Sequence, residues 1–218
     1  MSYSSGVIGT FSGMNIIALP CDTQPGVTAP SSIEWDANEA VAVNESPYTF
    51  QSQTYDWMAS ILTGTVSFPA MNRYSYDAWG AFILACRGQL NGFLLGDPKA
   101  NLPKGKASGT PLVNGANQAG YTLASHGWTA NKFGILLPGD YLQIGYRLYR
   151  VTASVNSDGS GNATIPLWPN LRDLPADGTA IVTRNCKGLF RLAANSGNKF
   201  SVNPGSYGLS GFKIREAL

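Results

Sequence analysis

Helical periodicity occurs once in this chain, and this limits the folds that the chain can adopt. One run of apolar side chains has the spacing i, i+3, i+4 and i+7: Trp79, Phe82, Ile83 and Cys86. This spacing puts all four side chains on one face, which predicts a helix over residues 73–87. Asn72 or Ser75 can cap its first turn, and Gly88 is placed to end it. A lone helix with one apolar stripe must pack against other elements, and the rest of the chain offers mainly strands.

Most of the remaining sequence has the composition and alternation of β-strands. Apolar and β-branched residues alternate with polar ones in short runs, which 25 Gly and 13 Pro residues help to separate. Asn91-Gly92 and Gly145-Tyr146 predict tight hairpin turns, and Gly64 predicts a bulge or a close approach of two strands. The expected fold class is therefore all-β with one main α-helix, which covers an open side or end of a β-sandwich.

A change in composition after Pro98 divides the expected strands between two domains. Residues 99–120 are rich in Gly, Pro and Asn and poor in apolar anchors. Short predicted strands then follow one another, with turn signals about every 8–12 residues, as in small barrels and sandwiches. The sequence predicts a β-sandwich domain from residues 1–103 and 186–218. It predicts a small β-barrel or sandwich domain inserted at residues 104–185.

Charged side chains make up only 13% of the chain, against about 25% in a typical globular protein. Two interpretations fit this low charge. The protein belongs to an assembly that covers much of its surface, because interface cores are poor in charge and rich in aromatic residues. Alternatively, it is a β-rich protein with neutral polar faces. The net charge of +2 is too small to indicate a nucleic-acid partner.

The cysteines and the hydropathy pattern give two further expectations. Cys21, Cys86 and Cys186 are odd in number and lack the spacing of metal sites. Free thiols in a protein made in the cytoplasm are the favoured interpretation, and a Cys21–Cys186 disulfide stays open. No signal peptide is predicted at the N-terminus, and no apolar run approaches the roughly 20 residues of a membrane span.

The sequence contains no recognisable catalytic motif. The single histidine, His126, precedes a glycine in a predicted turn, and no serine or cysteine motif accompanies it. Most aspartates fall at predicted turns, and the loop 156–162 lacks the ligand pattern of a calcium loop. We therefore expect a protein that is not an enzyme and has no catalytic residues, cofactor or metal. A pair of glycosidase carboxylates stays open, since sequence spacing does not reveal pairing in space.

Two groups of large side chains are candidates for defined roles. Core packing between the helix and the sheet is assigned to Trp79, Phe82, Ile83 and Phe93. Contact with a neighbouring subunit or a glycan is a possible role of four aromatic residues in the second domain: Trp128, Tyr146, Tyr149 and Trp168. The alternative for this second group is that two of the four lie in the core and the other two contact neighbouring subunits.

Two segments together resemble the minor tail or distal-tail-like proteins of long-tailed (siphovirus-type) bacteriophages. The first runs from Pro47 to Pro98 and contains Pro69-x-Met71, the helix with Trp79 and Phe82, Arg87-Gly88, and the run Phe93-Leu94-Leu95-Gly96-Asp97-Pro98. The second runs from Leu136 to Val182 and contains Gly139-Asp140, Val151, a glycine loop at 158–161, Pro166, Pro169 and Asp177-Gly178. Each motif is weak alone, and their order and spacing carry the resemblance.

The resemblance implies a structural virion protein at the phage tail tip or baseplate. Such proteins form a ring, usually a hexamer, that joins the tail tube to the baseplate hub or tip proteins and leaves a lumen for DNA. From the hydropathy and the charge we expect no membrane insertion and no sequence-specific nucleic acid. We place the interfaces on the sandwich strands and the loop Lys99 to Gly109. Three alternatives stay open: a carbohydrate-binding module at the tail tip, an enzyme that degrades surface polysaccharide, and a tail-tube or terminator subunit.

Overall fold

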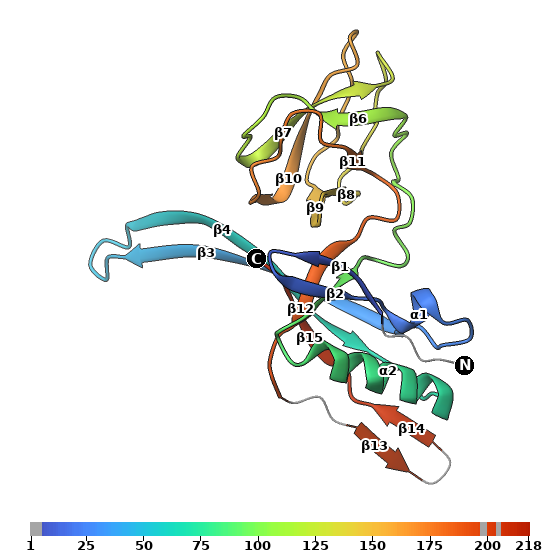
Figure 1. The fold of residues 1–218 in the computed structure, drawn as a ribbon. Helices are drawn as coiled ribbons and strands as arrows, with labels where there is room; N and C mark the ends of the chain where they lie inside the picture. The colour runs from blue at the N-terminus through green and yellow to red at the C-terminus, as the bar shows by residue number, and fades with distance from the viewer. Residues whose placement is uncertain (1–5, 197–199, 204–205) are drawn as a thin grey trace. The chain divides into compact units, whose positions relative to one another are not determined.

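The computed structural model describes residues 6–196, 200–203 and 206–218 (Figure 1). It is all-β with one main helix, which confirms the expected fold class. The helices are α1 (Pro20–Thr23) and α2 (Arg73–Cys86). The strands are β1 (Val7–Phe11), β2 (Met14–Ile17), β3 (Ser32–Glu45), β4 (Ser52–Ser67), β5 (Gly92–Leu95), β6 (Gly109–Val113), β7 (Gly120–Trp128), β8 (Tyr141–Ile144), β9 (Arg147–Val151), β10 (Ala163–Leu171), β11 (Ile181–Val182), β12 (Gly188–Leu192), β13 (Phe200–Asn203), β14 (Ser206–Leu209) and β15 (Phe212–Glu216).

The chain divides into two compact units. Unit 1 comprises Met1–Asp36, Leu62–Leu95 and Gly188–Leu218, and unit 2 comprises Ala37–Ile61 and Gly96–Lys187. This division differs from the expected one in two ways: the inserted segment begins earlier, and the outer half of the β3–β4 hairpin groups with it. Hydrogen bonds explain the grouping, because the Asn170 side chain donates to the Met58 carbonyl and accepts from the Ser60 hydroxyl, both at 2.8 Å.

Unit 1 is built on a seven-stranded sheet with the order β1-β2-β5-β12-β15-β4-β3. The pairs β1–β2, β5–β12, β12–β15 and β15–β4 run antiparallel, and β2 and β5 run parallel. Helix α2 packs on one face of the sheet through aromatic rings. The ring centroids of Phe82 and Phe93 are 5.2 Å apart, and those of Trp79 and Phe68 are 4.6 Å apart. These contacts form the core of the unit.

Helix α2 begins and ends where the sequence predicts. The Asn72 side chain accepts a 2.9 Å hydrogen bond from the Ser75 amide, which caps the first turn. Arg87 and Gly88 both take left-handed conformations, with φ of 51° and 66°, and these end the helix. The residues assigned to core packing are buried: Trp79, Phe82, Ile83 and Phe93.

The predicted hairpin at Asn91-Gly92 is wrong. Gly92 instead begins β5, whose partners are β2 and β12 rather than an adjacent strand across a turn. The Asn91 side chain is buried and donates to the Ala85 carbonyl near the end of α2. Asn91 therefore joins the helix end to the sheet, and its hydrogen bond satisfies a carbonyl that the helix leaves open.

Unit 2 contains a six-stranded sheet with the order β11-β8-β9-β10-β7-β6. Its two outer strands approach each other, because the Val113 amide donates to the Thr179 carbonyl and Leu112 forms a bridge with Ala180. The sheet therefore closes almost into a barrel around its own apolar core. The predicted hairpin at Gly145-Tyr146 is confirmed, since Ile144 and Arg147 are paired across it in β8 and β9.

Glycine permits two close approaches of the backbone. A Cβ at Gly64 in β4 would collide with the Glu34 carbonyl of β3, which confirms the close approach predicted there. A Cβ at Gly96 would collide with the Cys186 carbonyl. Gly96 begins the long segment of unit 2 and Cys186 lies near its end. The two connections of this segment therefore lie side by side, as expected for an insertion.

Candidate interaction surface

The described residues contain no assembled catalytic or metal site. No group of three or more His, Cys, Asp or Glu side chains over residues 6–196, 200–203 and 206–218 could hold a metal ion. His126 is half-buried in β7, where it pairs with Leu112 of β6. All three cysteines are free, so the alternative of a Cys21–Cys186 disulfide does not hold. Polar clusters and exposed surfaces are therefore the remaining candidates for a functional site.

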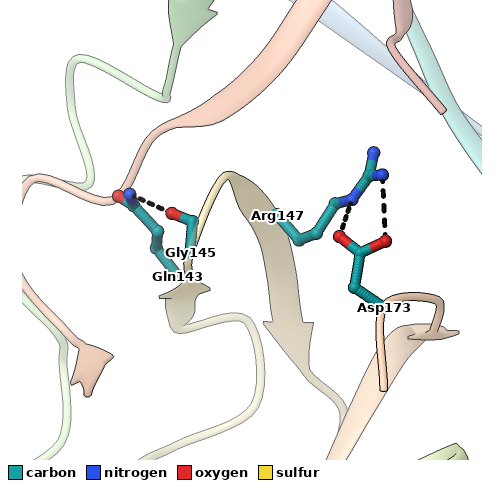
Figure 2. A network of polar contacts seen from close by, with 4 residues as sticks. All are labelled: Gln143, Gly145, Arg147 and Asp173. Carbon is teal, nitrogen blue, oxygen red and sulfur yellow. Dashed lines mark hydrogen bonds and ion pairs between the residues drawn. The ribbon is translucent and has the colours of Figure 1, made fainter. Parts of the chain in front are cut away.

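The buried cation of unit 2 has a structural role. Arg147 in β9 is 5% exposed in its side chain, and its Nε and Nη2 donate to the two carboxylate oxygens of Asp173 at 2.6 and 3.2 Å (Figure 2). The pair joins β9 to the loop after β10. In the adjoining hairpin, the Gln143 side chain donates to the Gly145 carbonyl at 2.8 Å. A buried guanidinium requires an anionic partner, and Asp173 provides it. The need to stabilise this buried charge in the folded state therefore explains the pair.

Asp140 is a second buried polar group with a structural role. Its buried carboxylate accepts hydrogen bonds from three backbone amides, those of Lys104, Gly105 and Leu137, at 2.7, 3.0 and 2.8 Å. These bonds hold the start of the inserted segment against the turn before β8. The predicted interface loop from Lys99 to Gly109 is thus anchored from within, while its three lysines remain exposed.

The Asp158 loop is closed by its own hydrogen bonds. The carboxylate accepts from the Asn162 amide and side chain and from the Ser160 amide, and these bonds lower the pKa of Asp158. Each donor belongs to the same turn. This arrangement is typical of a polar hairpin tip, as the sequence suggests, and it occupies the carboxylate oxygens.

The four aromatic residues proposed for surface contact separate into two pairs. Trp128 and Tyr149 are buried in the core of unit 2, at 4% and 2% exposure, so they do not have the surface role. This agrees with the alternative in which two of the four lie in the core. Their rings fill the inside of the nearly closed sheet, where the Trp128 indole donates to the Ser125 hydroxyl at 2.9 Å. Tyr146 and Trp168 are half-buried, and Trp168 donates to the Glu39 carboxylate.

The main exposed surface of large apolar side chains lies on the outer half of the β3–β4 hairpin. We call residues 36–59 the arm; Figure 1 shows its two strands running as a long ribbon. Every arm residue is exposed except the half-buried Ser46. The large apolar side chains include Tyr48 at 92%, Phe50 at 76% and Trp57 at 63% exposure. A two-stranded ribbon with both faces in water is marginally stable, and contiguous exposed apolar patches mark interaction sites.

Local contacts give the arm a defined shape. At its tip the Ser46 amide donates to the Gln51 carbonyl and the Phe50 amide donates to the Ser46 carbonyl, both at 2.9 Å. On β4 the rings of Tyr55 and Trp57 meet edge to face, with centroids 4.7 Å apart. Near its base Met58 has a φ of 50° and the Asp56 carboxylate accepts its amide hydrogen at 2.7 Å. The aromatic side chains are therefore presented on an ordered ribbon.

The arm is also uniformly acidic. It contains four carboxylates, Asp36, Glu39, Glu45 and Asp56, and no Lys or Arg. The sequence predicts that this segment belongs to the β-sandwich domain, residues 1–103 and 186–218. One sequence signal indicates the exposed acidic surface: Lys and Arg are absent from residues 1–72. A long hairpin in this segment therefore lacks the lysines that commonly protect exposed strand edges from pairing with another chain.

Comparison with known proteins does not identify the chain. No protein-family model matches it, and no curated protein matches its sequence. Among the described residues, the structure contains no helix with the length and hydropathy required to cross a bilayer. The acidic, aromatic arm is therefore the candidate functional site on its geometry alone.

Proposed function

We propose that this protein is a structural protein of a bacteriophage tail, a ring adaptor of the distal-tail type. In this role it joins the tail tube to the baseplate hub or tip proteins, and the ring leaves a lumen for DNA. It acts through protein contacts and carries out no chemical reaction. Its location would be the tail tip or baseplate of the virion.

The observation that carries this proposal is the exposed arm. An assembly subunit needs apolar surface that the monomer leaves in contact with water, and the arm provides aromatic side chains at exposures of 61–92%. Obligate interfaces are large and rich in such residues. A polar cluster that is exposed, unexplained and arranged for catalysis would favour an enzyme, whereas Arg147, Asp140 and Asp158 are each accounted for by local hydrogen bonds.

Two sequence features support the same proposal. The ordered motifs between Pro47 and Pro98 and between Leu136 and Val182 resemble those of distal-tail-like proteins. The charged fraction of 13% suits a subunit that is covered by neighbours on several sides. The glycan-binding alternative loses weight, because two of the four aromatic residues assigned to it are buried.

The test is the mass of the purified protein by light scattering, followed by negative-stain imaging of the oligomer. We expect closed rings with a central hole. Under the same conditions, the variant Phe50→Ser/Trp57→Ser should have a lower mass than the wild type, because it forms smaller oligomers. Its circular dichroism spectrum should be unchanged. Compact oligomers without a hole, or a wild-type protein that hydrolyses surface polysaccharide, would contradict the proposal.

A further inference from the structure

We propose that the arm of one copy docks on a basic strip of a second copy, formed by Arg191, Lys213 and Arg215. This inference rests on the proposed function, because it names the two surfaces that would meet between neighbours in the ring. It assigns one surface to the β3–β4 hairpin and the other to strands β12 and β15. The contact combines apolar burial with pairing of opposite charges.

The basic strip is a consequence of strand register. Arg191 of β12 is the direct partner of Arg215 of β15, and Lys213 lies two residues before Arg215 on the same strand. Side chains two apart on a strand share a face, so all three cations lie on one face of the sheet. Phe212 and Ile214 alternate with these cations along β15 and are buried on the other face, where α2 packs. The strip is therefore on the face that α2 leaves uncovered.

The direct register partners of the strip on β4 and β5 are uncharged. The register partners of Arg215 and Lys213 on β4 are Thr63 and Thr65, and the partner of Arg191 on β5 is Gly92. Within the described residues none of the three cations forms an ion pair, and the buried Nε of Arg191 has no hydrogen-bond partner. Like charges directly opposite each other in a sheet are destabilising, and a buried donor without a partner is costly. An anionic partner would relieve both.

The arm has the complementary chemistry. The arm contains no basic side chain that could pair with its four carboxylates. Because side chains two residues apart on a strand share a face, Glu39 and Glu45 lie on the same face of β3 as the exposed Val41 and Val43. The arm thus presents apolar side chains bounded by negative charge. A surface that matches the arm should be basic and open to an incoming ribbon. The strip is basic, and its neighbours on β4 are the short side chains of Thr63 and Thr65.

Charge distribution along the chain favours a second copy as the partner. Residues 1–72 contain six acidic and no basic residues, so their net charge is −6. Residues 73–218 contain the remaining seven acidic residues and all fifteen basic ones, so their net charge is +8. The chain as a whole is nearly neutral, yet it carries both members of a complementary pair. A patch on each copy that meets a different patch on the next generates a ring when the rotation closes.

The experiment is a charge exchange between the two surfaces. The arm variant N44K/E45K/Q51K/Q53K changes the arm from −4 to +1 and keeps Glu39, whose carboxylate accepts hydrogen bonds from Trp168 and Tyr121. The strip variant K213E/R215E changes the strip from +3 to −1. A third protein carries all six substitutions. The matched control K132E/R184E has the same change in net charge as the strip variant and alters two exposed residues outside the strip and outside the loop Lys99 to Gly109. Each protein is first checked for a native circular dichroism spectrum, and its self-association is measured by sedimentation velocity.

We expect the arm variant and the strip variant each to self-associate at least about tenfold more weakly than the wild type, because every contact then joins like charges. An equimolar mixture of the two should regain association, since each interface then joins opposite charges. The protein that carries both sets of substitutions should regain association alone. The control should behave as the wild type, and wild-type association should weaken between about 0.05 and 0.5 M NaCl.

The outcomes separate this inference from the proposed function. Wild-type rings that the charge variants leave unchanged would overturn the arm–strip contact and leave the ring adaptor standing. Restored association in the mixture, but as assemblies without a central hole, would support the contact and contradict the ring. A wild-type protein that stays monomeric at low salt up to the highest soluble concentration, or a mixture no stronger than its components, would overturn the inference.

Discussion

At the residue scale, the buried polar groups of this protein are best understood as parts of its scaffold. Asp140 and Arg147 are both in unit 2 and both nearly inaccessible. In an uncharacterised chain such groups are often candidates for catalysis. Here each has a complete set of local partners, which fix the start of the inserted segment and the loop after β10. Their loss should be felt in stability rather than in any activity.

Asp140→Asn tests this interpretation. An amide has one acceptor oxygen in place of two, so the substitution leaves at least one of the three amide donors without its partner. We expect the free energy of unfolding of unit 2 to fall by about 2 kcal/mol, measured by urea denaturation followed by Trp fluorescence. Asp177→Asn is the control, because the exposed Asp177 accepts a single bond from the Gly115 amide. Equal losses in the two variants would contradict the interpretation.

The buried thiols give a second prediction at this scale. Burial raises the pKa of Cys86 and Cys186 to about 12, from the ordinary value of 9.0. Their neutral forms are stable in the folded state, so this stabilisation is present below pH 9 and is lost as the pH rises toward 12. In native protein a thiol reagent should label Cys21 rapidly, and the other two only in denaturant. Between pH 8 and 10.5, the free energy of unfolding should fall further for the wild type than for the double variant Cys86→Ala/Cys186→Ala. Equal losses in the two proteins would contradict the prediction that the buried thiols cause this pH dependence.

At the scale of elements, α2 and the arm show opposite relations between sequence and burial. The apolar stripe of α2 lies against the sheet, while its outer residue Leu84 is 70% exposed. The arm exposes its apolar residues to solvent, although Glu39 and Met58 accept hydrogen bonds from the rest of unit 2. A helix needs only one covered face, whereas a two-stranded ribbon leaves both faces open unless another sheet, unit or chain covers them.

Two substitutions in α2 should therefore differ sharply. Phe82 is fully buried and its ring meets those of Trp79, Phe93 and Phe212, so Phe82→Ala should lower the free energy of unfolding by about 3–5 kcal/mol. Leu84→Ala on the exposed face should change it by no more than about 0.5 kcal/mol. Thermal or urea unfolding measures both. A large loss for Leu84→Ala in dilute monomer would show that this face is also covered.

At the scale of the whole molecule, unit 2 has the parts of an independent domain. Its core consists of buried residues between Val113 and Ile181, and its two connections to unit 1 lie side by side at Gly96 and Cys186. A segment of this kind can fold around its own core, since few contacts within that core come from other parts of the chain. Met58 of the arm and the adjoining Ser60 contribute hydrogen bonds to this segment rather than core packing.

We predict that the isolated fragment 96–187 folds. Its thermal unfolding should be cooperative, and its near-ultraviolet circular dichroism should show the fixed environment of the buried Trp128. It should be slightly less stable than unit 2 in the full chain, because the bonds from Ser60 and Met58 to Asn170 are absent. The same fragment with Ile165→Ala, which removes a fully buried side chain, is the destabilised control. A broad, non-cooperative transition in the parent fragment would show that the arm is required for folding.

Local chemistry explains which elements were predictable. The stripe of α2, its Asn72 cap and the Gly145-Tyr146 hairpin depend on residues that are neighbours in the sequence, and each was predicted. Asn91-Gly92 has the local chemistry of a hairpin and does not form one, because β2 and β12 offer longer-range pairings to β5. The surface role of Trp128 and Tyr149 failed for a related reason. An aromatic residue in a β-strand has the same sequence signal whether its ring faces the inside of a barrel or the solvent.

Periodicity, capping and turn chemistry predict the class of fold, the position of the main helix and an inserted segment, because these signals act over a few residues. The neighbours of each strand, the burial of each aromatic ring and the exposure of the β3–β4 hairpin became known from the folded structure. Those outcomes depend on contacts between residues far apart in the chain, such as Arg191 with Arg215 and Ser60 with Asn170. The acidic arm and the basic strip are both visible as charges in the sequence, but only strand register gathers the strip onto one face.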